Sequence, residues 1–151
     1  MQKYFRSVAM IRRYEREQAA WLGVWNGDRS QWDFIIGERL DQESFRETAL
    51  REVSWQLGLD RNRDLLVSNM SHLNLEYVGC VPGETEQKHV ALAFYAVDVY
   101  RAAAMEKICK SADCAWLSSQ EVCTGQRSDG TSVDPKVTTW VNRWGIIQPW
   151  Q

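Results

Sequence analysis

The spacing of apolar and polar positions divides the first third of the chain into short, strand-like runs followed by a helical stripe. The runs lie at residues 5–13, 19–25 and 32–36 and are rich in strand-forming residues. The first ends in a charged cluster, and the second ends at residues 26–28, whose Asn-Gly-Asp sequence is typical of a turn. This pattern predicts a β-hairpin followed by a third strand that ends at Gly37.

The segment from Ser44 to Leu57 contains neither proline nor glycine, and its apolar residues recur at helical spacing. Ser44 suits the N-cap of a helix, and Glu47 three residues later completes a capping box. Gly58 follows directly and is typical of a helix C-terminus. We therefore predict a helix that ends at Gly58.

The second part of the chain predicts further strands and helices. The candidate strands are residues 74–79, 90–100 and 115–117, with a helical turn at 105–110, a turn at 118–122 and a polar loop at 125–132. Asp134-Pro135 has the N-cap and first-turn chemistry of a last helix, which runs to about Trp144. The order of these elements predicts one α+β domain over residues 1–151, with a mixed β-sheet between helices.

The composition excludes several classes of protein. Hydrophobic residues make up 44% and charged residues 25% of the chain, as in ordinary globular proteins. The net charge of −2 argues against a strong nucleic-acid footprint. No apolar stretch reaches the roughly 20 residues of a membrane span, and the N-terminus lacks the pattern of a signal peptide. The four cysteines lack CxxC spacing, so we expect reduced thiols in a cytoplasmic protein rather than a zinc site.

Eight tryptophans are the one unusual feature of the composition. Most are expected to pack in the core or at its edges, because large amphipathic rings are well suited to such positions. The alternative is that one or two of them stack on a flat ligand such as a nucleobase.

Residues 32–59 carry a motif and read WDFIIGERLDQESFRETALREVSWQLGL. Seven positions of this segment match the spacing of the Nudix signature: Gly37, Glu43, Arg51, Glu52, Val53, Gly58 and Leu59. The segment therefore resembles the Nudix box, and Trp116-Leu117-Ser118 followed by Glu121-Val122 extends the likeness toward the C-terminus. The resemblance implies the Nudix fold, an α/β/α arrangement that covers nearly the whole chain.

The same resemblance shows what the box has lost. In the family, Mg²⁺ or Mn²⁺ ions held by box glutamates neutralise a pyrophosphate and lower the pKa of the attacking water. The paired glutamates of the box fall on Trp55 and Gln56, so that Glu52 alone remains of three metal ligands on one helix face. The usual Pro-Gly falls on Ile35-Ile36, and the glycine before the first glutamate falls on Gln42.

The candidate site residues follow from the box. Glu52 is the candidate catalytic and metal-binding residue, and any further ligand would come from acidic residues elsewhere: Glu84, Glu86, Asp98, Glu106 and Asp113. The candidate ligand-binding residues are Trp55, Gln56 and Trp32. Trp55 either lines the cleft and stacks on a ligand or packs under a neighbouring loop.

Four box residues have structural explanations, namely Gly37, Glu43, Arg51 and Gly58. The resemblance implies that Glu43 and Arg51 form an ion pair that ties the loop to the helix. Arg51 could equally pair with Glu47 at i, i+4 spacing, which would contribute only a few tenths of a kcal/mol.

Two functional hypotheses remain. The first is a non-catalytic module that binds a nucleotide-like or phosphorylated ligand, or another protein, and that needs no cofactor. The second is an active hydrolase of nucleoside diphosphate-linked substrates, in which Glu52 and a later acidic residue rebuild a Mg²⁺ or Mn²⁺ site. The resemblance also makes a homodimer a reasonable expectation.

Overall fold

The long strand β1 (Lys3–Glu15) joins the two halves of the sheet in the computed structural model, which describes residues 1–151. Its first part pairs in parallel with β7 (Gln87–Val99) and antiparallel with β4 (Ile35–Glu38). Its last part forms the predicted hairpin with β2 (Gln18–Asn26). Because side chains alternate along a strand, β1 contributes residues to a hydrophobic core on each face of the sheet.

The remaining strands complete a mixed sheet of nine strands around β1, β2 and β7. Two strands pair antiparallel with β7, namely β5 (Leu65–Val67) and β6 (Leu73–Cys80). Two others pair antiparallel with β2, namely β3 (Gln31–Asp33) and β8 (Cys114–Ser118). The short strand β9 (Ser132–Val133) pairs in parallel with β3.

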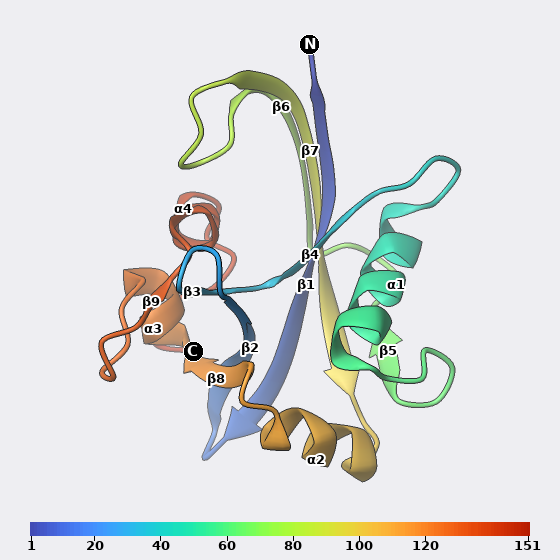
Figure 1. The fold of residues 1–151 in the computed structure, drawn as a ribbon, viewed down its shortest axis with the longest axis vertical. Coiled ribbons are helices and arrows are strands. Elements are labelled where there is room, and N and C mark those ends of the chain that lie inside the picture. Colours follow the sequence, from blue (N-terminus) through green and yellow to red (C-terminus); the bar gives the residue numbers. More distant parts are fainter.

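Helices cover both faces of this sheet (Figure 1). The helix α1 (Phe45–Leu57) packs on one face, where it shares a core with α2 (Ala102–Lys110). The opposite face is covered by α3 (Ser119–Thr124) and α4 (Pro135–Arg143). The mixed sheet between helices is the α+β arrangement predicted from the sequence. None of the helices combines the length and apolar character needed to cross a membrane.

The helix α1 begins and ends as predicted. The Ser44 side chain accepts a hydrogen bond from the Glu47 amide at 3.0 Å, and the Glu47 carboxylate accepts one from the Ser44 amide at 3.1 Å. Gly58 ends the helix with φ of 63°, a left-handed conformation that glycine adopts at little cost. The buried Ser7 hydroxyl of β1 donates to the Phe45 carbonyl at 2.6 Å and so attaches the start of α1 to the sheet.

Several sequence expectations were wrong in detail. The single strand expected at residues 32–36 is divided at Phe34 into two strands. The first, β3, pairs with β2, and the second, β4, pairs with β1. The strands β5 and β9 were missed, because segments of three and two residues show no periodicity. The turn expected at residues 118–122 is the helix α3, which begins with a second capping box between Ser118 and Glu121.

Candidate functional site

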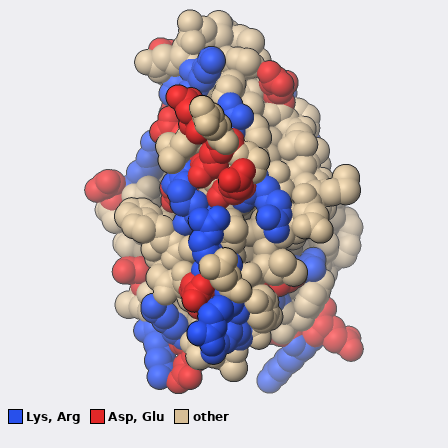
Figure 2. Space-filling model, turned by 90° about the vertical axis from the view of Figure 1, so that its right-hand side faces the viewer, with Lys and Arg blue, Asp and Glu red and all other residues tan.

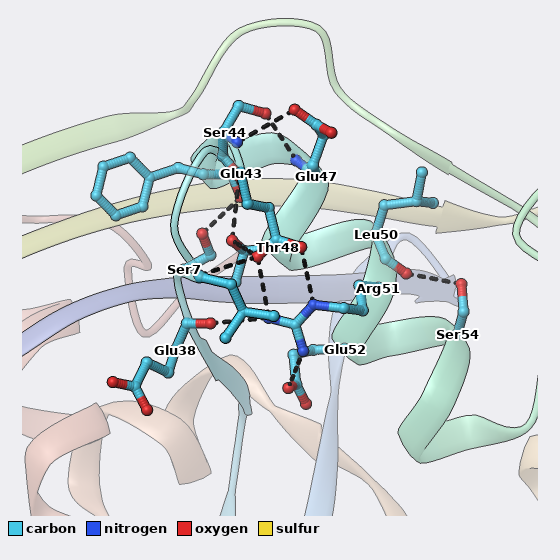
Figure 3. A network of polar contacts seen from close by, with 12 residues as sticks. Ser7, Glu38, Glu43, Ser44, Glu47, Thr48, Leu50, Arg51, Glu52 and Ser54 are labelled. Carbon is cyan, nitrogen blue, oxygen red and sulfur yellow. Dashed lines mark hydrogen bonds and ion pairs between the residues drawn. The ribbon is translucent and has the colours of Figure 1, made fainter.

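Arg51 connects α1 to the loop that precedes it (Figure 3). Its Nε donates to Glu43 Oε2 at 2.9 Å, and its Nη2 lies 3.0 Å from Glu43 Oε1 and 2.8 Å from the Glu38 carbonyl oxygen. Glu47 is engaged in the capping box instead, so Arg51 takes the first of the two partners that the sequence left open. A two-point contact of this kind is stronger and more directional than a single charged hydrogen bond.

The environment of Glu43 favours its ionised form. The hydrogen bond from Arg51 lowers the pKa of Glu43 to about 2, against an opposing effect of burial. The hydroxyl of Thr48, which is fully buried, lies 2.6 Å from Glu43 Oε1 and acts in the same direction. Glu43 is therefore a structural carboxylate that anchors the loop, and it is held as an anion by its neighbours.

Both carboxylate oxygens of Glu52 have partners within the chain. Oε1 accepts from Arg51 Nη1 at 2.7 Å, and Oε2 accepts from Gln56 Nε2 at 2.9 Å. Its side chain is 16% exposed and packs directly on the backbone of Gly37 in β4. A Cβ atom at Gly37 would lie only 2.0 Å from Glu52 Cγ, so this approach of α1 to β4 requires glycine.

A groove runs beside the C-terminal half of α1, between that helix, the end of β2 and the α2–β8 connection. It consists of two adjoining cavities of about 720 and 700 Å³. The residues that line both are Val24, Trp25, Gly27, Trp55 and Gln56. Two of the predicted ligand-binding residues, Trp55 and Gln56, thus line the groove together. Trp25 lines it as well, although it was not predicted to bind a ligand.

The overall architecture matches several solved structures. The Ap4A hydrolase of C. elegans aligns with a TM-score of 0.60 and 13% identity over 97% of this chain and 98% of that one. A mutT/nudix family protein from Listeria innocua aligns with a TM-score of 0.62 and 12% identity, over 97% and 94% of the two chains. The chain has the Nudix fold. No family model and no curated protein sequence matches it.

A third structural neighbour is a longer protein, of which this chain matches only a part. NrtR of Shewanella oneidensis aligns with a TM-score of 0.63 and 12% identity over 92% of this chain but only 60% of that one. NrtR has also been solved in complex with a 27mer DNA. On this chain, the side covered by α1 shows Lys and Arg interspersed with Asp and Glu rather than one continuous basic surface (Figure 2). The absence of a strong nucleic-acid footprint stays a prediction.

The residues at the Nudix box do not fit a Mg²⁺ or Mn²⁺ site. These hard cations require several oxygen ligands in near-octahedral array, whereas the indole at position 55 offers no oxygen and the amide at position 56 offers one uncharged oxygen. Glu52 is already engaged, and nowhere in the chain do three or more His, Cys, Asp or Glu side chains gather as a metal site requires. Of the acidic residues considered as extra ligands, Asp113 alone lines the groove.

The other four acidic candidates lie outside the groove. Glu84 forms an ion pair with Lys88, and Glu106 forms one with Lys110. Asp98 lies on β7, and Glu86 is exposed in the β6–β7 connection. The structure thus does not bring these four residues to Glu52.

The tryptophans divide between core and surface. Trp55 is 78% exposed, so it does not pack under a neighbouring loop, and its ring is available to the groove. Trp32 was expected to bind ligand, but it is 8% exposed, belongs to the core and donates from Nε1 to Thr131 Oγ1 at 3.0 Å. Trp25, and not Trp32, lines the groove. The Trp25 ring also packs edge-to-face on Trp32, with ring centroids 5.0 Å apart. The only feature of the sequence that could have indicated this position is the turn at residues 26–28, which places Trp25 near the end of its strand.

Replacement of Gly37 by alanine tests the contact between β4 and α1. We expect Gly37→Ala to lower the free energy of unfolding by about 1–3 kcal/mol, because the new methyl group overlaps the Glu52 side chain. The matched control is Gly27→Ala, since a Cβ at Gly27 meets no atom within 4 Å and Gly27 has no positive φ. Chemical denaturation of both variants measures the difference, and equal stabilities would show that Glu52 is not packed on Gly37.

The pKa of Glu43 predicts a pH dependence of stability. Its value of about 2 in the folded state lies below the ordinary 4.5, so ionised Glu43 stabilises the fold above about pH 4.5, and this contribution is lost as the pH falls toward 2. We expect the stability advantage of the natural protein over Glu43→Gln to shrink across that interval. Denaturation curves at several pH values measure it, and a constant difference between the two proteins would contradict the assignment.

Proposed function

We propose that this chain is a non-catalytic binding module on a Nudix scaffold, which takes a nucleotide-like ligand in the groove beside Trp55. The observation that carries the proposal is the state of Glu52. The one carboxylate left at the metal-binding positions of the box is held by Arg51 and Gln56, and the residue one helical turn from it is an exposed indole. The helix face that would hold metal ions instead presents a stacking surface.

Trp25 and Trp55 are suited to a flat ligand. Trp25 is partly buried and packs edge-to-face on the buried ring of Trp32, whereas Trp55 is exposed on the surface of α1. Stacking of a base on an aromatic ring contributes about 1–3 kcal/mol and requires no particular base. The C. elegans neighbour, an Ap4A hydrolase, is named for a nucleotide substrate, which supports a nucleotide-like ligand by analogy of fold.

Hydrolysis of a nucleoside diphosphate-linked substrate is the second function considered. It would require Glu52 to give up its two hydrogen bonds and a divalent ion to find further oxygen ligands. Loss of one preorganised group that stabilises transition-state charge commonly lowers the rate by about 10²–10³-fold. With two box ligands replaced, the family's usual route would leave little turnover.

Intrinsic tryptophan fluorescence tests binding in this groove. Adenosine or ATP is expected to quench the natural protein and to leave Trp55→Leu largely unquenched, because the exposed ring contributes the stacking contact. Trp150→Leu is the matched control, since Trp150 is 77% exposed and does not line the groove. Equal quenching of Trp55→Leu and the control would place the ligand elsewhere.

Comparison of the natural protein with Glu52→Gln decides between binding and catalysis. A phosphate- and pyrophosphate-release assay would cover nucleoside triphosphates, dinucleoside polyphosphates and nucleotide sugars, with Mg²⁺ and with Mn²⁺. We expect the natural protein to show no turnover above that of Glu52→Gln. Turnover that is lost in Glu52→Gln would establish the hydrolase instead.

A further inference from the structure

The groove is lined by more negative than positive charge. Its charged residues are Asp28, Asp33, Asp113 and Lys107. The ammonium group of Lys107 already donates to the Gly58 carbonyl at 2.6 Å, and Asp33 is paired with Lys136 at 2.7 Å. Asp28 and Asp113 take part in none of the ion pairs of the chain, so two exposed carboxylates face the single ammonium group of Lys107 in the groove.

The backbones of these two acidic residues are held close to Trp25 in the chain fold. The carbonyl oxygen of Asp113 accepts a hydrogen bond from the Trp25 amide at 2.8 Å, which places the backbone of Asp113, in the turn just before β8, beside the backbone of Trp25. Asp28 follows Trp25 by three residues, in a turn that Asn26 Oδ1 holds through the amides of Asp28 and Arg29. Asp113 lines one of the two cavities and Asp28 lines the other, so each cavity bordered by Trp25 and Trp55 also has an acidic residue in its lining.

The helices add to the negative potential. The groove is lined by the C-terminal turn of α1, at Trp55, Gln56 and Leu57, and by the C-terminal end of α2, at Ile108 and Ser111. A helix C-terminus carries a partial negative charge from its unpaired carbonyl groups. Neither helix presents its N-terminus, the end that binds phosphate.

We propose that the groove selects a planar ring that carries positive charge, such as an N-alkylated purine or pyridinium, and disfavours a polyphosphate. The faces of tryptophan rings attract cations as well as stack on them, and the two carboxylates and two helix ends act in the same direction. A polyphosphate would meet the same negative groups with only Lys107 to offset them. This inference rests on the proposed function, because it assigns the charge of the ligand to the same site.

A matched pair of nucleosides tests the inference. 1-Methyladenosine carries a positive ring charge at pH 7, whereas adenosine has nearly the same shape and is neutral. We expect 1-methyladenosine to quench the groove tryptophans with an affinity at least about tenfold higher than adenosine, and adenosine to bind more tightly than ATP. The variant with both Asp28→Asn and Asp113→Asn should lose most of this preference. Asp41→Asn, which alters an exposed carboxylate outside the groove, should retain it.

The outcomes separate this inference from the function on which it rests. Equal affinity for the two nucleosides, with quenching that still depends on Trp55, would overturn the charge preference and leave a neutral stacking site. Tighter binding of ATP than of either nucleoside would overturn it as well. Quenching by none of the three would remove both the inference and the proposed function. A preference for the cation that persists in the double variant would show that the carboxylates do not cause it.

Discussion

The arrangement of Arg51 between two glutamates is the interaction on which the site depends. Through Glu43 it fixes the loop that leads into α1, and through Glu52 it holds the carboxylate that packs on Gly37. The distance between α1 and β4 is set by that contact, because no side chain larger than hydrogen fits at Gly37. The groove depends on it in turn, since Trp55 and Gln56 are positioned by the same helix.

The charge balance of α1 follows from this arrangement. Three glutamates on one helix face would repel each other, and bound cations would be needed to offset that repulsion. Here one glutamate remains, its charge is balanced by Arg51, and Gln56 completes its hydrogen bonding. The negative charge on this face of α1 is therefore balanced within the chain, without a bound cation. The exposed indole of Trp55 has no such structural explanation, and its exposure motivates the proposal that Trp55 contacts a ligand.

The box motif and the helix were predictable because both depend on local spacing. The Ser44 capping box and the end at Gly58 involve residues at most four positions apart. The Glu43–Arg51 pair was implied by the family resemblance alone, and local spacing left Glu47 as an equal partner of Arg51. The burial of Trp32 and the partial exposure of Trp25 were not predictable, because the two residues are cross-strand partners and the pattern of the sequence does not distinguish which ring packs in the core. The acidic lining of the groove could not be foreseen either, since Asp113 reaches Trp25 through a pairing of β2 with β8 that joins distant parts of the sequence.

We propose that Glu52 is a structural carboxylate and not a metal ligand. A titration with Mn²⁺, followed by the electron paramagnetic resonance signal of the free ion, tests this claim most directly, with Glu52→Gln measured in parallel. We expect no stoichiometric binding up to millimolar Mn²⁺ and no difference between the two proteins. Stoichiometric binding that disappears in Glu52→Gln would contradict it and would show that Glu52 leaves Arg51 and Gln56 to hold a metal ion.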